Sequence, residues 1–158
     1  MAEYTATVTW SRGSAAFVDN RYSRAHRWLF DGGAEVAASS SPEVVPVPMS
    51  DPEAVDPEEA FVASVASCHM LWFLTTAARA GYVVETYTDD ARATLGRDDR
   101  GRQSITRVAL CPRVTYDGKA PDAAAEAELH HIAHEQCFIA ASVRSKVTID
   151  PRQETQPL

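Results

Sequence analysis

One long apolar segment limits what this chain can fold into. Residues 60–80 carry apolar or small side chains at almost every position, and no charged residue interrupts them before Arg79. A helix that lacks a polar face is buried on most of its sides. A chain of 158 residues can hardly wrap such a helix alone. We therefore infer a homodimer, in which a second copy of the chain buries the remaining face.

The ends of this segment carry helix signals. Asp56 can cap the helix, Pro57 suits its first turn, and Glu59 stands three residues after Asp56, which is the spacing of a capping box. Gly81 is typical of a helix C-terminus. The sequence therefore predicts a helix that starts after Asp56 and ends at Gly81.

Alternating apolar and polar residues predict strands on both sides of this helix. We expect strands at residues 4–10, 16–20, 22–30, 86–95, 105–116 and 142–149, and a second helix at 121–136. Residues 34–55 have no period and predict a long loop that could act as a lid or as an arm around a partner. The order βββ-α-ββ-α-β indicates one α+β domain over residues 1–158, with antiparallel sheets packed on long central helices.

Charge and composition exclude several classes. The net charge is −7, with scattered basic residues, so we expect no nucleic-acid partner. The N-terminus has neither a basic nor an apolar signal region, and no apolar stretch reaches the roughly 20 residues that cross a bilayer. An odd number of cysteines without a signal segment is typical of a reducing cytosol, so we expect a cytoplasmic protein.

The three cysteines have different neighbours. His69 follows Cys68, and His134 stands three residues before Cys137, whereas Cys111 has no such neighbour. A cysteine reacts as the thiolate, which a nearby positive charge stabilises. Two thiols could therefore form a peroxidase pair, in which one attacks a peroxide and the other resolves the sulfenic acid. A buried cysteine can also serve simply as a small apolar side chain.

Thiolate chemistry of this kind needs a cation and a carboxylate. Arg12, Arg24 and Arg27 are the candidate cations, and Glu58 or Glu59 is the candidate carboxylate. Most such arginines are solvated or paired at the surface, and both glutamates also suit the N-terminus of a helix.

A metal site is a further alternative. His130, His134 and Cys137 share one helix face, and Cys68 or His69 could complete a tetrahedral zinc site. No Cys-x-x-Cys or His-Glu-x-x-His motif is present, so we expect no metal and no other cofactor.

Both cysteine segments resemble those of the OsmC/Ohr family, and the likeness spans nearly the whole chain, element order included. The segments are Asp56-Pro57-Glu58-Glu59-Ala60-Phe61 with Ala66-Ser67-Cys68, and Ala133-His134-Glu135-Gln136-Cys137 with Ser142-Val143. The resemblance implies an intertwined α+β homodimer with two sites at its interface. It also implies a thiol-dependent peroxidase that reduces organic hydroperoxides and is recycled by an external thiol or dithiol.

Carried over by position, the resemblance makes Cys68 the nucleophile and Cys137 the resolving thiol. Glu58 matches the family's glutamate ten residues before the first cysteine, and it would pair with an arginine. Arg24 is our choice for that arginine, with Arg12 as the alternative. We also expect His69, Trp72, Phe138 and Arg12 to contact substrate.

Two residues depart from the better-known branches of the family. Phe138 stands where those branches have proline, and His69 stands where they usually have phenylalanine. The chain therefore resembles a separate OsmC-like branch. The alternative function is a non-catalytic small-molecule-binding module on the same scaffold, and a zinc-dependent hydrolase or metal-storage protein is a third.

Helix geometry gives one further prediction. In a straight helix, ten residues place Glu58 and Cys68 about 15 Å apart along the axis and on different faces. They can join one site only if the helix breaks between them or if an arginine bridges the gap. We predict a kink or break shortly before Cys68, which would bring that thiol near a helix N-terminus.

Overall fold

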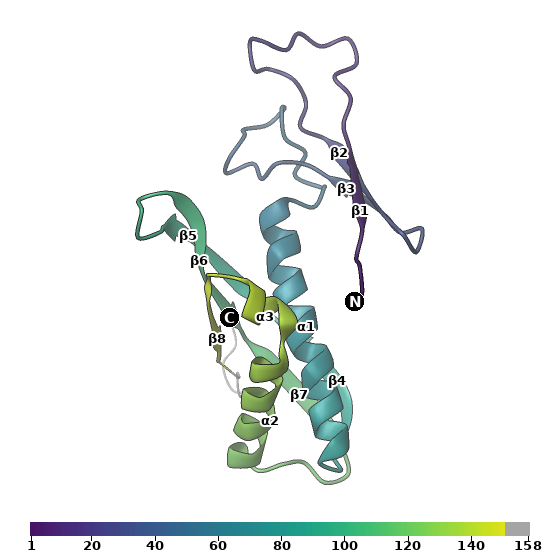
Figure 1. Ribbon diagram of the computed structural model, residues 1–158, viewed down its shortest axis with the longest axis vertical. Coiled ribbons are helices and arrows are strands. Elements are labelled where there is room, and N and C mark those ends of the chain that lie inside the picture. Colours follow the sequence, from purple (N-terminus) through teal and green to yellow (C-terminus); the bar gives the residue numbers. More distant parts are fainter. Residues whose placement is uncertain (151–158) are drawn as a thin grey trace. The chain divides into compact units, whose positions relative to one another are not determined.

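The computed structural model describes residues 1–150 and divides into two compact units (Figure 1). The first unit is Met1–Ala60, and the second begins at Phe61. Helices and mainly antiparallel sheets confirm the predicted α+β class. The assignment of one domain to residues 1–158 stays a prediction.

The first unit contains a three-stranded antiparallel sheet in the order β1-β2-β3. Its strands are β1 (Ala6–Thr9), β2 (His26–Phe30) and β3 (Glu35–Ala38). Strands were therefore correctly predicted within residues 4–10 and 22–30, although both are shorter than expected.

Two predictions for this unit are wrong. Residues 16–20 form no strand, because the chain turns there: the N–H of Asn20 donates to the Phe17 carbonyl at 3.0 Å, and Asn20 has a φ of 62°. In contrast, β3 lies inside the expected loop 34–55. It forms because Gly33, at a φ of 84°, reverses the chain after β2, and the N–H of Phe30 donates to the Ala34 carbonyl at 3.0 Å.

The long helix α1 (Pro57–Arg79) has the two ends that the sequence predicts. The N–H of Glu59 donates to the Asp56 carboxylate at 2.8 Å, and the N–H of Asp56 donates to the Glu59 carboxylate at 3.1 Å, so the capping box is confirmed. At the other end Gly81 has a φ of 83°, and the N–H of Tyr82 donates to the Ala77 carbonyl at 3.0 Å. This Schellman arrangement satisfies the last carbonyls of the helix.

The buried stripe of α1 contributes to two core clusters along the length of the helix. Near its start, Val65 packs with Val108 and Leu110; further along, Phe73 and Ala77 pack with the next helix in one core cluster. By length and composition α1 could also cross a bilayer, so the statement that no segment reaches that length is wrong. Core helices meet the same criterion, and four α1 residues face the interior: Val65, His69, Phe73 and Ala77.

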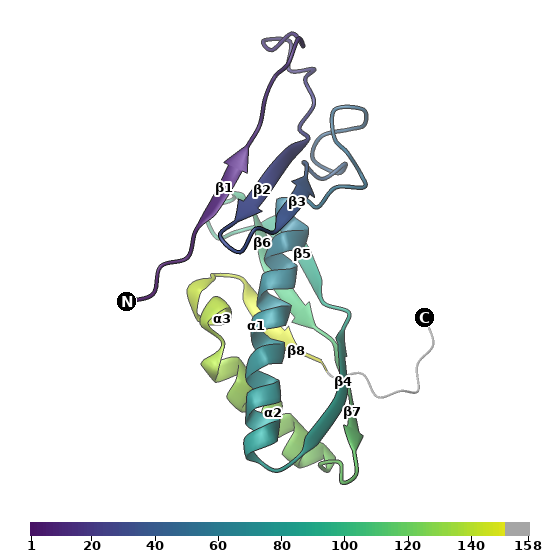
Figure 2. The same cartoon turned by 90° about the vertical axis from the view of Figure 1, so that its right-hand side faces the viewer.

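Each of the two strands expected at residues 86–95 and 105–116 is divided into two shorter strands. They are β4 (Val83–Asp89), β5 (Arg92–Arg97), β6 (Gln103–Leu110) and β7 (Pro112–Asp117). β4 pairs with β7, whereas β5 and β6 belong to another sheet (Figure 2). The chain changes sheets where the N–H of Cys111 donates to the Asp89 side chain at 2.7 Å, and Pro112, which has no N–H to donate, begins β7.

The remaining elements are α2 (Ala123–Gln136), α3 (Phe138–Ser142) and β8 (Lys146–Ile149). The second helix is confirmed, but α3 occupies the first residue expected in the last strand, so that strand is shorter. β8 pairs with β6 in parallel, which the expectation of purely antiparallel sheets did not include. α1 and α2 lie side by side and run in opposite directions (Figure 1).

Candidate functional site

The second unit brings two of the three thiols together. The side chains of Cys68 on α1 and Cys137 at the end of α2 are neighbours that interact with each other, and both cysteines are free. Cys137 is buried, with 1 % of its surface exposed, whereas Cys68 is partly exposed. Burial, and to a smaller extent the neighbouring Cys68 side chain, raises the pKa of Cys137 to about 11. Cys137 is thus held as a thiol beside a more accessible partner.

Cys137 is fixed by its position between two helices. It ends α2, where its N–H donates to the His134 carbonyl at 3.2 Å, and it caps α3, where its Sγ accepts from the N–H of Ala140 at 3.4 Å. A cysteine with two backbone contacts of this kind has little freedom to turn away from its neighbour. The break between α2 and α3 therefore positions the second thiol.

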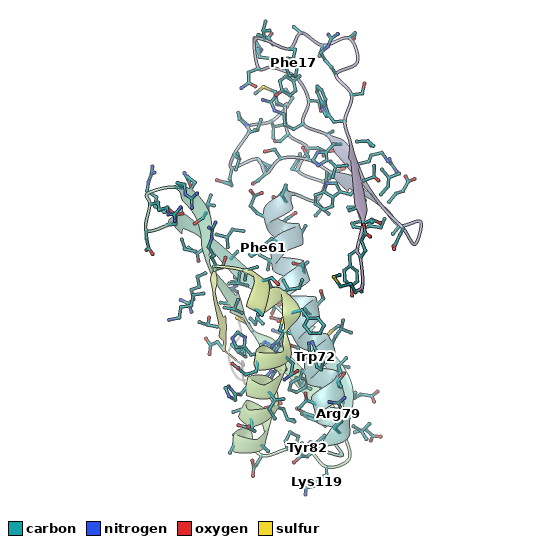
Figure 3. The ribbon with its side chains drawn as sticks, viewed as in Figure 1. Phe17, Phe61, Trp72, Arg79, Tyr82 and Lys119 are labelled. Atoms are coloured by element: carbon teal, nitrogen blue, oxygen red, sulfur yellow. The ribbon has the colours of Figure 1, made fainter. Side chains whose placement is uncertain are left out.

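Two predicted substrate-contact residues lie together next to this pair. Trp72 is four residues after Cys68, and therefore on the same side of α1, while Phe138 directly follows Cys137. Their rings meet edge to face, with centroids 5.6 Å apart, and Phe138 is 67 % exposed. Figure 3 labels Trp72 on α1. Sequence reasoning had grouped these residues without a contact between them.

His69 points away from solvent into the core. It is fully buried, and its Nε2 lies 3.1 Å from Nδ1 of His130, which is 3 % exposed. The two rings are nearly parallel, with an interplanar angle of 8°, and Phe73 stacks on His130. Burial, followed by the nearby His130 and His134, lowers the pKa of His69 to about 3; burial lowers the pKa of His130 to about 4. Both rings are therefore neutral at physiological pH.

We expected His69 to contact substrate, but its ring is fully buried against His130. Among residues 1–150, the outer nitrogens of the pair, Nδ1 of His69 and Nε2 of His130, have no hydrogen-bond partner. No group of three metal-ligating side chains within the described part of the chain could hold an ion, and His130 uses Nδ1 for His69. The zinc alternative therefore has no preformed site in residues 1–150.

The third thiol is separate from the pair. Cys111 lies between β6 and β7 with 6 % of its surface exposed, and its backbone binds Asp89. This position matches the bystander role that the sequence assigns to it.

The first unit holds a pocket of about 490 Å³. Its wall includes three aromatic rings, an arginine and a glutamate, and the full lining is Val8, Trp10, Phe17, Tyr22, Arg24, His26, Ser39, Ser40, Pro57 and Glu58. Ser39 and Ser40 come from the segment 34–55, so that segment contributes to a pocket of its own chain. The size is within the range of about 300–1,000 Å³ that is usual for small-molecule sites.

Among the three candidate arginines, Arg24 alone lines this pocket. Its guanidinium donates to the Asn20 carbonyl at 3.0 Å and to the Asn20 side chain at 2.7 Å, and it also contacts the Tyr22 carbonyl. Arg12 instead binds the Ala15 carbonyl, and Arg27 forms an ion pair with a strand neighbour, Glu35.

The two candidate glutamates also differ in their positions. Glu59 closes the capping box, while Glu58 lines the pocket that contains Arg24. No ion pair joins Glu58 to Arg24 in the described residues, because the turn at Asn20 holds the guanidinium.

Sequence reasoning missed His26 as a pocket residue. Its Nε2 accepts from the Trp28 indole at 3.0 Å, so Nδ1 carries the proton that is donated to the Arg24 carbonyl at 2.8 Å. The alternation of residues 22, 24, 26 and 28 in the sequence carried the signal, since it placed His26 on the same face as Arg24.

The predicted break before Cys68 is wrong. α1 continues without interruption from its first turn through Cys68. Hydroxyls that could loosen the helix instead bind back to it: Ser64 donates to the Phe61 carbonyl at 2.8 Å, and Ser67 donates to the Ser64 carbonyl at 3.3 Å. Cys68 therefore gains no stabilisation from a helix N-terminus.

Comparisons with known proteins agree with this architecture. A family model for OsmC-like proteins matches residues 50–152, which include both cysteines of the pair. A solved OsmC-like protein of unknown function from Vibrio cholerae is 52 % identical to this chain. The likeness covers 96 % of this chain and 100 % of the other, with a TM-score of 0.92. The chain belongs to the OsmC-like family. No curated protein matches it.

More distant structures show the same fold as this OsmC-like chain. An organic hydroperoxide resistance protein of Bacillus subtilis is 21 % identical, with a TM-score of 0.65 over 94 % of this chain and 98 % of the other. Another, from Elizabethkingia anophelis with bound thiocyanate, is 17 % identical, with a TM-score of 0.68 over 96 % and 94 %. At these identities the likeness concerns the fold alone.

Proposed function

We propose that this OsmC-like chain is a thiol-dependent peroxidase that reduces organic hydroperoxides. The observation that carries the proposal is the proximity of Cys68 and Cys137, two free thiols on different helices. A disulfide can form between two thiols only when they lie close together. The organic hydroperoxide resistance proteins among its structural relatives suggest the substrate class.

The surroundings of the two thiols assign their order. Cys68 is the more exposed, so peroxide reaches it first, whereas Cys137 is buried and its pKa is raised to about 11. The Cys68 thiolate attacks the outer peroxide oxygen, an S–O bond forms, and the O–O bond breaks. The alkoxide takes up a proton and leaves as an alcohol, and Cys68 becomes a sulfenic acid.

Cys137 then completes the cycle. Its sulfur attacks the Cys68 sulfur, an S–S bond forms, and the sulfenic oxygen leaves with the Cys137 proton as water. An external thiol or dithiol reduces the disulfide and restores both thiols. The family resemblance assigns the roles of activating cation and partner carboxylate to Arg24 and Glu58, which line one pocket of the first unit.

We also propose that the chain works as a homodimer in the cytoplasm, where thiols stay reduced. An uncharged strip of α1 supports a dimer: Ser64, Ser67, Leu71 and Ala78 are exposed, and Leu71 is 60 % accessible. Light scattering coupled to size-exclusion chromatography measures the mass, and a value of one chain at all concentrations would contradict this assembly.

The deciding experiment follows the consumption of cumene hydroperoxide with dithiothreitol as reductant. We expect Cys68→Ser to abolish turnover and Cys137→Ser to accumulate a sulfenic acid that a dimedone probe traps. Cys111→Ser is the matched control and keeps the wild-type rate, since Cys111 lies outside the pair. Absence of hydroperoxide consumption by the wild type with any dithiol would refute the peroxidase and favour the binding module.

A further inference from the structure

The first unit contains a stack of aromatic rings that the thiol chemistry does not use. The rings of Phe17 and Tyr22 are stacked, with centroids 4.6 Å apart and an interplanar angle of 19°. Trp10 meets Tyr22 edge to face at 5.3 Å, and the Arg24 guanidinium carbon lies 3.8 Å from the centroid of the Tyr22 ring. Phe17 lies in the segment that joins β1 to β2 (Figure 3).

The stack has a defined order. A guanidinium at 3.8 Å and a phenyl ring at 4.6 Å cannot share one face of Tyr22 without colliding, so Arg24 and Phe17 cover opposite faces. Both faces of Tyr22 are therefore covered, whereas Phe17, whose ring centroid lies 6.0 Å from that of Trp10, stays half exposed. Trp10 is held in place because its indole N–H donates to the Ser23 carbonyl at 2.8 Å.

These rings form the wall of a pocket and not a closed core. Phe17 is 50 % exposed and Trp10 is 42 % exposed, yet both line the cavity of about 490 Å³. Exposed rings that are fixed on a pocket wall offer a flat apolar surface, and aromatic ligands gain more from such a surface than saturated ones of equal size do.

The charged groups of the pocket limit the charge of its ligand. Arg24 and Glu58 are both in the lining and carry opposite charges, so the wall has no excess of either sign. Arg24 would repel a cation, and Glu58 would repel an anion. The lining therefore suits an uncharged molecule with an aromatic body and a small polar group.

We propose that the Trp10, Phe17 and Tyr22 cluster binds the aromatic ring of an uncharged aryl-alkyl hydroperoxide, so that the chain prefers aryl over saturated substrates. The peroxide group in this assignment rests on the proposed function. Recognition of the ring rests on the pocket alone. Phe17 is the residue that determines this specificity, because its half-exposed ring lines the pocket.

The test compares two unreactive alcohols that differ only in the ring. The probes are 2-phenyl-2-propanol and 2-cyclohexyl-2-propanol, and their dissociation constants are measured by ligand-observed NMR titration of the full chain. We expect the phenyl compound to bind about two- to tenfold more tightly, which corresponds to one or two added aromatic contacts.

Two variants locate the preference. Phe17→Leu keeps an apolar side chain but removes the ring, so we expect it to equalise the two affinities. Tyr4→Leu removes a 90 % exposed ring of the same unit that does not line the pocket, and it keeps the preference. Since Phe17 is half exposed, its substitution leaves the fold intact, as circular dichroism will verify.

The outcomes separate this inference from the peroxidase proposal. Equal affinities in the wild type, absence of binding by both probes, or a preference that survives Phe17→Leu would overturn the aryl site. A preference that is lost in Phe17→Leu supports it, even if no hydroperoxide is turned over. In that last case the peroxidase proposal fails and the aryl-binding pocket stands.

Discussion

Acidification should destabilise this protein through the buried His69–His130 pair. Both histidines are neutral in the folded chain because their pKa values are lowered to about 3 and about 4. In the unfolded chain each has an ordinary pKa of about 6.5 and takes up a proton as the pH falls below that value. The unfolded state then binds more protons than the folded state, so the free energy of unfolding decreases with falling pH.

The size of the effect follows from the two shifts. Each histidine contributes about 1.4 kcal/mol for every pH unit below about 6.5, until the folded pKa is reached. At pH 5 the difference is about 2 kcal/mol per histidine, or about 4 kcal/mol for the pair. A typical domain has only about 5–15 kcal/mol of stability in total. The contribution is complete above about pH 6.5 and is lost progressively as the pH falls, down to about pH 4 for His130 and about pH 3 for His69.

Urea unfolding at a fixed protein concentration, from about pH 7.5 to pH 5, measures this slope. The double variant His69→Gln and His130→Asn places amide groups where Nε2 and Nδ1 now meet, and it should remove most of the pH dependence. His131→Gln, at an exposed position of α2, is the matched control and should keep the wild-type slope. A wild-type stability that changes by less than about 1 kcal/mol over this range would refute the reasoning.

Two further substitutions test the capping and the packing of α1. Asp56→Ala removes the capping box and should cost about 0.5–2 kcal/mol in urea unfolding, whereas Asp56→Asn keeps a good cap and should lose far less; equal losses would contradict the capping role. Phe73→Ala empties a fully buried site between α1 and α2 and should cost about 3–5 kcal/mol, measured in the same way. Tyr4→Ala, at an exposed ring, should change stability little, and a comparable loss there would argue against packing as the cause.

Local signals in the sequence were sufficient for α1. Capping by Asp56 and the left-handed turn at Gly81 depend on residues within one helical turn, so both ends could be predicted. The strands were less predictable. The alternation of apolar and polar residues continues through Asp89 and Cys111, so it predicts one strand in each place. Only the pairing of the two halves of each predicted strand with different sheets reveals the bends there.

The predicted break in α1 failed for a related reason. That prediction placed Glu58 and Cys68 in one site and chose a bend in the helix over an arginine that bridges the gap, but the helix is continuous. Instead, Glu58 faces a pocket of the first unit, and Cys68 meets Cys137 of the second. The family resemblance identified the candidate site residues, whereas the packing of separate elements decided which of these residues are neighbours.

By itself, the sequence determined the α+β class, the central helix and the two cysteines that carry the proposed chemistry. The tertiary structure alone decided that His69 contacts His130, 61 positions away, and that Cys137 is the buried member of the thiol pair. It also decided that Arg24, rather than Arg12 or Arg27, lines the pocket. Helix caps and periodicity act over a few residues. Burial, and the pKa shifts that follow from it, depend on which distant segments exclude water from a side chain.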